Sequence, residues 1–118
     1  MAATVGEGEL SGARVRESDL TEVSFPQGSR LIQADLVGVT LTYADLTEVN
    51  LSLADLTGAS LGYSNLTRAE LWRANLTEAI LPVTVFTGAE LSRADLSGAT
   101  LTDADLTEAS LFDTNLSV

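Results

Sequence analysis

A five-residue period constrains the fold of this chain more than any other feature. From Leu31 to Leu116 an apolar residue recurs at every fifth position, which makes 18 units, 17 centred on Leu and one on Phe86. A small residue lies two positions before each centre, and in 12 of the 18 units it is Ala. Asp or Asn often lies between them, and Thr, Ser or Gly often follows. Such regularity is typical of a repeat architecture, in which each unit buries its apolar side against its neighbours.

The period of five matches neither a helix nor a long strand, whose side chains repeat every 3.6 and every 2 residues. Recurring Ser, Thr, Asn, Asp and Gly also disfavour a helix. In a short extended piece, the small residue and the Leu point to the same side, and the residue between them points to the other. The two remaining residues have turn chemistry. We therefore expect each unit to form one side and one corner of a polygon, with the small residue and the Leu inside.

The angle at the corners determines how many units close one coil. If each corner turns by about a right angle, four units make a coil of about 20 residues, and successive coils stack about 4.8 Å apart. The Leu and Ala positions then form parallel columns that fill the interior. A filled interior this narrow leaves no cleft for a substrate.

Several units match the motif of a known family at every position. The units at 44–48, 54–58 and 104–108 read ADLTE, ADLTG and ADLTE. They fit the pattern (A/S/T/V)-(D/N)-(L/F)-(S/T/R)-x, so the sequence resembles the pentapeptide repeat family. The resemblance implies an all-β fold, a right-handed quadrilateral parallel β-helix, which is a β-solenoid of five-residue repeats.

The first 28 residues carry a fainter version of the same period, with centres at Val5, Leu10, Val15, Leu20 and Phe25. We predict a single domain over 1–118, with degenerate repeats in 1–28, regular repeats in 29–118, and nearly six coils. One extra residue separates Phe25 from Leu31, and Pro26-Gln27-Gly28 occupies this gap. A bulge or a widened corner near Gly28 is expected. The extra residue is either a tolerated insertion or part of a functional loop.

The composition disfavours catalysis. The chain has 17 acidic residues and six arginines, a formal net charge of −11, and no His, Cys or Lys. Nucleophile–base pairs, histidine-bound metals and zinc thiolates are therefore not available. We expect no enzymatic activity, no cofactor and no metal. The most regular polar column is interpreted as a set of acceptors for backbone hydrogen bonds, rather than as a metal or catalytic site; its members are Asp35, Asp55, Asn75, Asp95 and Asn115.

The sequence also sets expectations about location and assembly. It shows neither a signal peptide nor an apolar run that would span a bilayer, so we expect a cytoplasmic protein without membrane contact. The negative charge and the absence of Lys disfavour direct binding of nucleic acid. Neither end of the sequence resembles a capping segment, so an end-to-end homodimer is a further expectation.

Outward-facing residues 20 apart are expected to stack in columns on the surface. One column contains Tyr43, Tyr63 and Val83, with Ile80 and Val85 beside it. On another face, Ile32, Trp72 and Phe112 occupy the same column position in alternate coils. The adjacent column contains Arg73 and Arg93. Exposed aromatic and Arg side chains are typical of binding surfaces. The alternative is corner packing, in which the rings cover their own coils. The candidate partner surface comprises Tyr43, Tyr63, Ile80, Val83, Val85, Trp72, Arg73 and Arg93.

Three functional hypotheses follow. The first is a non-enzymatic scaffold for protein–protein interaction, including a regulatory one. The second is an acidic DNA mimic, because the charge per unit length is comparable with that of duplex DNA, about one per 1.7 Å. The resemblance supports this hypothesis, since family members of the quinolone-resistance type occupy the DNA-binding saddle of DNA gyrase, but the C-terminal helix and projecting loop of those proteins have no counterpart here. The third is ice binding through Thr47, Thr67, Thr87 and Thr107.

Overall fold

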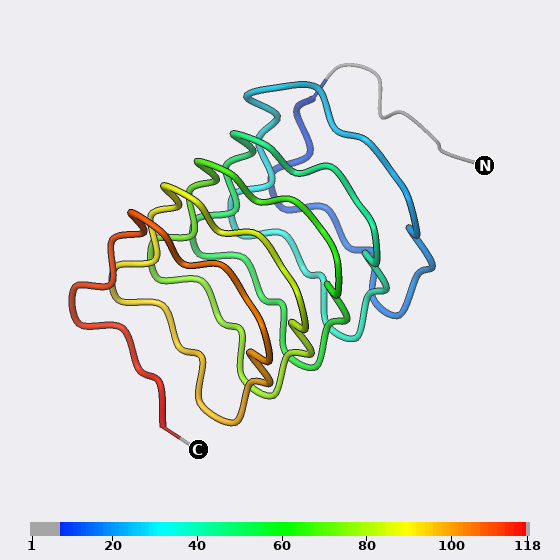
Figure 1. Ribbon diagram of the computed structural model, residues 1–118. Coiled ribbons are helices and arrows are strands. Elements are labelled where there is room, and N and C mark those ends of the chain that lie inside the picture. The colour runs from blue at the N-terminus through cyan, green and yellow to red at the C-terminus, as the bar shows by residue number, and fades with distance from the viewer. Residues whose placement is uncertain (1–7, 118) are drawn as a thin grey trace.

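The chain winds into a stack of coils, with the first and the last described coil at opposite ends (Figure 1). The structure is a computed structural model, and it describes residues 8–117; the degenerate unit centred on Val5 lies outside this range. Parallel bridges join residues 20 apart, as in Arg30↔Asn50 and Asp55↔Asn75. Four five-residue units therefore close each coil, as predicted. The principal extents are 34 × 24 × 22 Å.

Each side of the coil pairs with its neighbour through one residue only. Within residues 8–117 there is no helix and no run of paired residues that forms a strand; the parallel bridges are isolated. The extended sides expected from the sequence are thus shorter than strands, because two residues in every five form a corner. This part of the chain also has no apolar helix long enough to cross a membrane.

Backbone hydrogen bonds join the coils in a fixed register. The unit around Leu56 shows the pattern: its N–H donates to the carbonyl of Asn75 at 2.7 Å, and the N–H of Asn75 donates to the carbonyl of Ala54 at 2.9 Å. A third bond closes the corner, from the N–H of Ala59 to the carbonyl of Leu56 at 2.9 Å. The same three bonds recur along the chain, so each side is held by both of its neighbours.

From Val23 to Leu96 the interior is filled by the Leu and Ala columns, as predicted, whereas Leu111 and Leu116 at the end of the stack are exposed. Leu51, Leu61 and Leu71 have no exposed surface, and Phe86 takes a Leu position without becoming exposed. Thr84, which replaces the usual Ala, donates its hydroxyl to the carbonyl of Leu61 at 2.8 Å. Within residues 8–117, every buried side-chain nitrogen or oxygen has a hydrogen-bond partner.

The corners place one residue each in the left-handed region of backbone space. The third residue of the four-residue turn has a positive φ in coil after coil, for example 60° at Gln33, 61° at Tyr43 and 66° at Gly58. A positive φ at this position is what a type II turn requires. Glycine fills several corners, but large side chains fill most of them. The corner backbone therefore fixes the direction in which these side chains leave the coil.

The extra residue lies between Ser24 and Arg30, because bridges before this segment join residues 21 apart and those after it join residues 20 apart. The N–H of Ser29 donates to the carbonyl of Pro26 at 2.9 Å, so Pro26 begins the corner turn. Gly28, with a φ of 80°, takes the usual left-handed corner position. The added residue therefore lengthens the side before the corner, and the corner itself has the ordinary form.

The phase of the repeat can be tested with two neighbouring substitutions. Leu66 has no exposed surface, so Leu66→Ala should lower the free energy of unfolding by about 2–5 kcal/mol, as for other buried Leu truncations. Thr67→Ala should lower it by less than about 1 kcal/mol, because it removes one exposed hydroxyl hydrogen bond. Chemical denaturation measures both. Equal losses would contradict the inward phase of the Leu column.

Candidate partner-binding surface

The residues of the regular polar column accept hydrogen bonds from the corners that follow them. The carboxylate Oδ1 of Asp55 accepts the N–H of Thr57 at 3.1 Å and its hydroxyl at 2.6 Å. Asn75 accepts the N–H of Thr77 at 3.0 Å in the same way, and Asp35, Asp95 and Asn115 repeat the bond to the residue two positions on. These side chains are the backbone acceptors that the sequence predicted. No group of acidic residues within 8–117 has the arrangement of a metal site.

The threonine column is also occupied by internal bonds. The hydroxyl of Thr47 donates to Oδ1 of Asp45 at 2.7 Å, and those of Thr67 and Thr107 donate to Asn65 and Asp105. A hydroxyl that already donates its hydrogen bond within its own unit cannot donate the same bond to an ice lattice. The geometry thus favours a corner-stabilising role for these threonines over ice binding.

Hydrogen bonds at the corners also keep the carboxylates ionised. The side-chain and backbone donors of Thr107 hold the pKa of Asp105 below its ordinary value, and those of Ser97 do the same for the pKa of Asp95. A hydrogen bond from Arg16 lowers the pKa of Asp35. Carboxyl groups with lowered pKa values are poor proton donors near neutral pH, so these residues do not resemble general acids.

The lowered pKa values predict a loss of stability in acid. A carboxylate whose pKa is lower when folded stabilises the protein above its unfolded pKa, and this contribution is lost as the pH falls through the folded pKa. We expect Asp95→Asn with Asp105→Asn to lose less stability than the wild type between about pH 7 and pH 3. Asn75 shows that an amide can accept the same corner bond without titrating. Equal losses, measured by chemical denaturation, would contradict this origin of acid sensitivity.

The predicted apolar column forms one continuous surface. The rings of Tyr43 and Tyr63 stack with their centroids 5.0 Å apart and their planes 13° apart. They remain 58% and 52% exposed, so stacking on each other does not remove them from solvent. Val83 continues the column, Ile80 is exposed on one side of this corner, and Val85 is half-buried on the other. We call Tyr43, Tyr63, Ile80, Val83 and Val85 the tyrosine strip.

The side that leads to the tyrosine strip and the first corner position carry no charge over three coils, a feature that our predictions did not include. On the side that follows the corner, Asp45 and Asp105 lie in the same column as Val85. The side that leads to this corner presents Thr40, Ser60, Ile80 and Thr100, and the first corner position presents Thr42, Gly62, Pro82 and Thr102. The uncharged region ends at Glu22 in one direction and at Asp103 in the other. Its absence of charge could have been read from the sequence by comparing residues 20 apart. Charged residues are depleted in the cores of protein interfaces.

The residues around Trp72 form a second surface, which the structure separates from the tyrosine strip. The guanidinium carbon of Arg73 lies 4.9 Å from the centroid of the Trp72 ring, and the ring stays 40% exposed. Arg93 lies one coil further on, with its Nε 4.0 Å from the carboxylate of Asp113. One corner, at Thr77 and Glu78, lies between those of Trp72 and Val83 along a four-cornered coil, so the two surfaces lie on opposite corners. We call the second one the tryptophan corner.

An apolar pocket of about 190 Å³ lies near the N-terminal end of the described chain. Leu10, Val15 and Leu20, which line it, are only partly buried, so the core is less completely filled here than in the coils that follow. The lining has no polar side chain; it consists of Leu10, Ala13, Val15, Leu20, Phe25, Leu31 and Leu36.

Comparison with known proteins agrees with this geometry. The family model for pentapeptide repeats matches residues 27–58, 54–82 and 84–117, with eight copies. The chain belongs to the pentapeptide repeat family. Its relationship to solved members of the family implies a right-handed β-helix fold. The first 26 residues lie outside the matched ranges, although Glu9 and the units after it already pair with the next coil. No curated protein shows a significant match to the chain.

Three solved structures show the range of similar proteins. A pentapeptide repeat protein from the thylakoid lumen of Arabidopsis thaliana is 33% identical, with 82% of this chain and 71% of that chain covered and a TM-score of 0.69. One from the cyanobacterium Cyanothece 51142 is 21% identical, with 92% and 87% covered and a TM-score of 0.63. QnrB1, a plasmid-mediated fluoroquinolone resistance protein, is 14% identical, with 97% and 70% covered and a TM-score of 0.67. The last two similarities concern the fold alone.

Val83 offers a test of how the corners shape the tyrosine strip. Its φ of 55° is unfavourable for a β-branched residue, so Val83→Gly should raise the free energy of unfolding by about 1 kcal/mol. The matched control is Gly58→Val, because Gly58 has a φ of 66° and a Cβ there would meet no atom within 4 Å. Gly58→Val should lower the stability by a similar amount. If chemical denaturation shows neither the gain in stability for Val83→Gly nor the loss for Gly58→Val, the left-handed corners are not strained.

Proposed function

We propose that this protein is a non-enzymatic scaffold that binds a protein partner through the tyrosine strip. The observation that supports the proposal is a strip of five uncharged residues, with two exposed and stacked tyrosines, on a chain with a net charge of −11. In our proposal the protein is a four-sided rod of nearly six coils that presents this strip along one corner. A regulatory role would follow from holding or blocking the partner, since the strip has no chemistry to transform it.

The rigidity of the strip supports binding. Tyr63 donates its backbone N–H to the carbonyl of Pro82 at 3.0 Å, and Tyr43 donates its own to the carbonyl of Gly62 at 3.1 Å. Gly62 and Pro82 pack closely, since a Cβ on Gly62 would lie 3.1 Å from Cγ of Pro82. A surface that is already ordered loses little conformational entropy when a partner binds. Tyrosine is also among the residues that contribute most to interface affinity.

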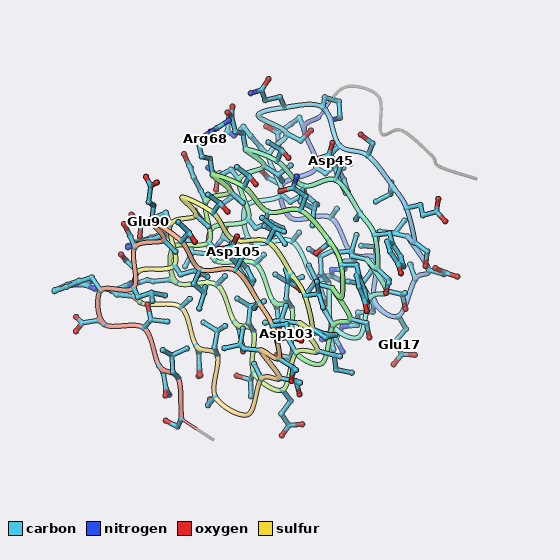
Figure 2. All side chains as sticks on the ribbon, viewed as in Figure 1. Glu17, Asp45, Arg68, Glu90, Asp103 and Asp105 are labelled. Carbon is cyan, nitrogen blue, oxygen red and sulfur yellow. The ribbon has the colours of Figure 1, made fainter. Side chains whose placement is uncertain are left out.

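The DNA-mimic hypothesis rests on the acidic charge and on the quinolone-resistance members of the family. The distribution of charge favours the scaffold instead. Acidic side chains such as Glu17, Asp45 and Glu90 project from different sides of the coil stack (Figure 2). Two of the arginines lie against carboxylates on the surface, Arg16 against Asp35 at 2.6 Å and Arg68 against Glu48 at 2.9 Å. A mimic needs one face of concentrated negative charge, and here the acids are dispersed and partly compensated.

Two sets of substitutions separate the proposals. If the tyrosine strip binds the partner, Tyr43→Ala with Tyr63→Ala should abolish most of the capture of a partner from lysate. The matched control is Asp45→Asn with Glu48→Gln and Glu108→Gln, which removes acidic charge and leaves the strip intact. The control should bind as the wild type does, and binding should change little between about 0.01 and 0.15 M salt, although the screening length falls from about 30 to 8 Å.

An assay with purified DNA gyrase tests the DNA-mimic hypothesis directly. A DNA mimic acts through its charge, so it should alter gyrase supercoiling at micromolar concentration, and the effect should weaken with salt and with the three acid substitutions. The tyrosine double variant should then act as the wild type does. This outcome would contradict the scaffold proposal and support mimicry. Unchanged supercoiling at all salt concentrations would exclude the gyrase alternative.

A further inference from the structure

The tryptophan corner combines an alternating column with a basic one. At the first corner position, large and small side chains alternate from coil to coil: Ile32, Ser52, Trp72, Ser92 and Phe112. The second position carries Gln33, Leu53, Arg73, Arg93 and Asp113. Backbone bonds of 2.9, 3.1 and 2.8 Å tie these corners together, from Leu53, Arg73 and Arg93 to the next coil. The side chains therefore project from a continuous, rigid edge.

The charge of this corner differs from that of the rest of the molecule. Its two turn columns hold Arg73 and Arg93 against the single acid Asp113, whereas each of the other three corners carries more acids than arginines. Arg73 forms no ion pair with any residue in 8–117, and the contact of Arg93 with Asp113, at 4.0 Å, is long. The carboxylate of Glu90 accepts the N–H of Ser92 at 2.8 Å, so it is engaged elsewhere. Two neighbouring guanidinium groups are thus available to a ligand.

The alternation also leaves room for a ligand side chain. Trp72 and Phe112 lie two coils apart, which corresponds to about 9.6 Å, and only the small side chain of Ser92 lies between them in this column. Phe112 is 68% exposed and Trp72 is 40% exposed. Ser92 therefore lies between two exposed aromatic residues of its column, with Arg73, whose guanidinium lies over the Trp72 ring, and Arg93 in the adjacent column.

We propose that the tryptophan corner binds an extended acidic peptide segment of a partner. One apolar side chain of the segment seats over Ser92, between Trp72 and Phe112, and carboxylates on either side of it pair with Arg73 and Arg93. Arg binds carboxylates with two parallel hydrogen bonds, so such a site fixes the orientation of the carboxylate as well as complementing its charge. Because the tyrosine strip lies on the opposite corner, this site is separate from the proposed function, and both surfaces can be occupied at once.

Two other occupants fit the corner less well. Glu70, Glu90 and Asp95 on the sides next to this corner repel any anion, so the corner matches only a ligand whose few carboxylates lie at Arg73 and Arg93, whereas a nucleic acid strand carries a negative charge at every phosphate. A second copy of this chain carries a net charge of −11 and is repelled as a whole. A short segment with a few carboxylates around one apolar residue matches two arginines and a single apolar slot.

Trp72 is the only tryptophan in the chain, so its fluorescence reports on this corner alone. The probe is a blocked octapeptide of serine and glycine with a central Glu-Phe-Glu, titrated into the full-length protein. We expect a saturable change in Trp72 emission at low salt. Arg73→Gln with Arg93→Gln should weaken binding about tenfold, the size expected for two exposed charge pairs. Gln33 shows that glutamine tolerates the left-handed conformation at this corner position.

Matched controls make the test specific. Arg16→Gln with Arg68→Gln removes two exposed arginines from other corners and should leave the affinity unchanged, and so should Tyr43→Ala with Tyr63→Ala. The proposal is overturned if the peptide causes no change, if a lysine version binds equally well, if oligothymidylate binds more tightly, or if the Arg16 and Arg68 control loses as much affinity. Equal binding of a peptide with a central Glu-Gly-Glu, which has the same charge, would overturn the apolar contact over Ser92. Circular dichroism of each variant checks that the fold is retained.

Discussion

The hydrogen bonds between coils are the constraint on which the rest of the structure depends. Each side offers only one bridge residue, so no single coil has enough pairing to be stable by itself. Stacking solves this problem because each coil satisfies the backbone groups of the next, with bonds of 2.7–3.0 Å around units such as Leu56. The register of 20 residues then decides which side chains meet. Every surface column in the molecule, polar or aromatic, follows from that register.

The corners determine the direction in which the side chains of each column leave the coil. A left-handed residue at each corner is unfavourable for most side chains, and the chain accepts it at Tyr43, Arg73 and Val83 alike. The inter-coil bonds hold these residues in place and aim their side chains outward from a rigid edge. A flat-sided rod without a central cleft can thus display rings and charges with little loss of entropy on binding. Recognition at corners is the form of function that this geometry supports.

Charge divides the surface into regions with different uses. The dispersed acids and their corner hydrogen bonds stabilise turns, as Asp55 does with Thr57, and also keep the chain strongly negative. Against this background, the uncharged tyrosine strip and the basic tryptophan corner stand out as two separate surfaces on opposite corners. The proposed partners differ accordingly, an uncharged protein surface for one and an acidic segment for the other. A protein with both surfaces would be able to bring two partners together.

The sequence by itself determined which side of each unit is buried. An apolar residue every five positions, with a small one two before it, has one arrangement that buries both, so Leu66 inside and Tyr63 outside were predictable from local pattern. The coil of four units was predictable as well. The tertiary structure alone decided that the sides pair through single residues, that the rings of Tyr43 and Tyr63 lie nearly parallel within their predicted column, that Arg73 lies over Trp72 and that an apolar pocket lies beside Phe25. These features depend on distances between residues about 20 apart and on backbone angles at the corners, which a five-residue pattern does not encode.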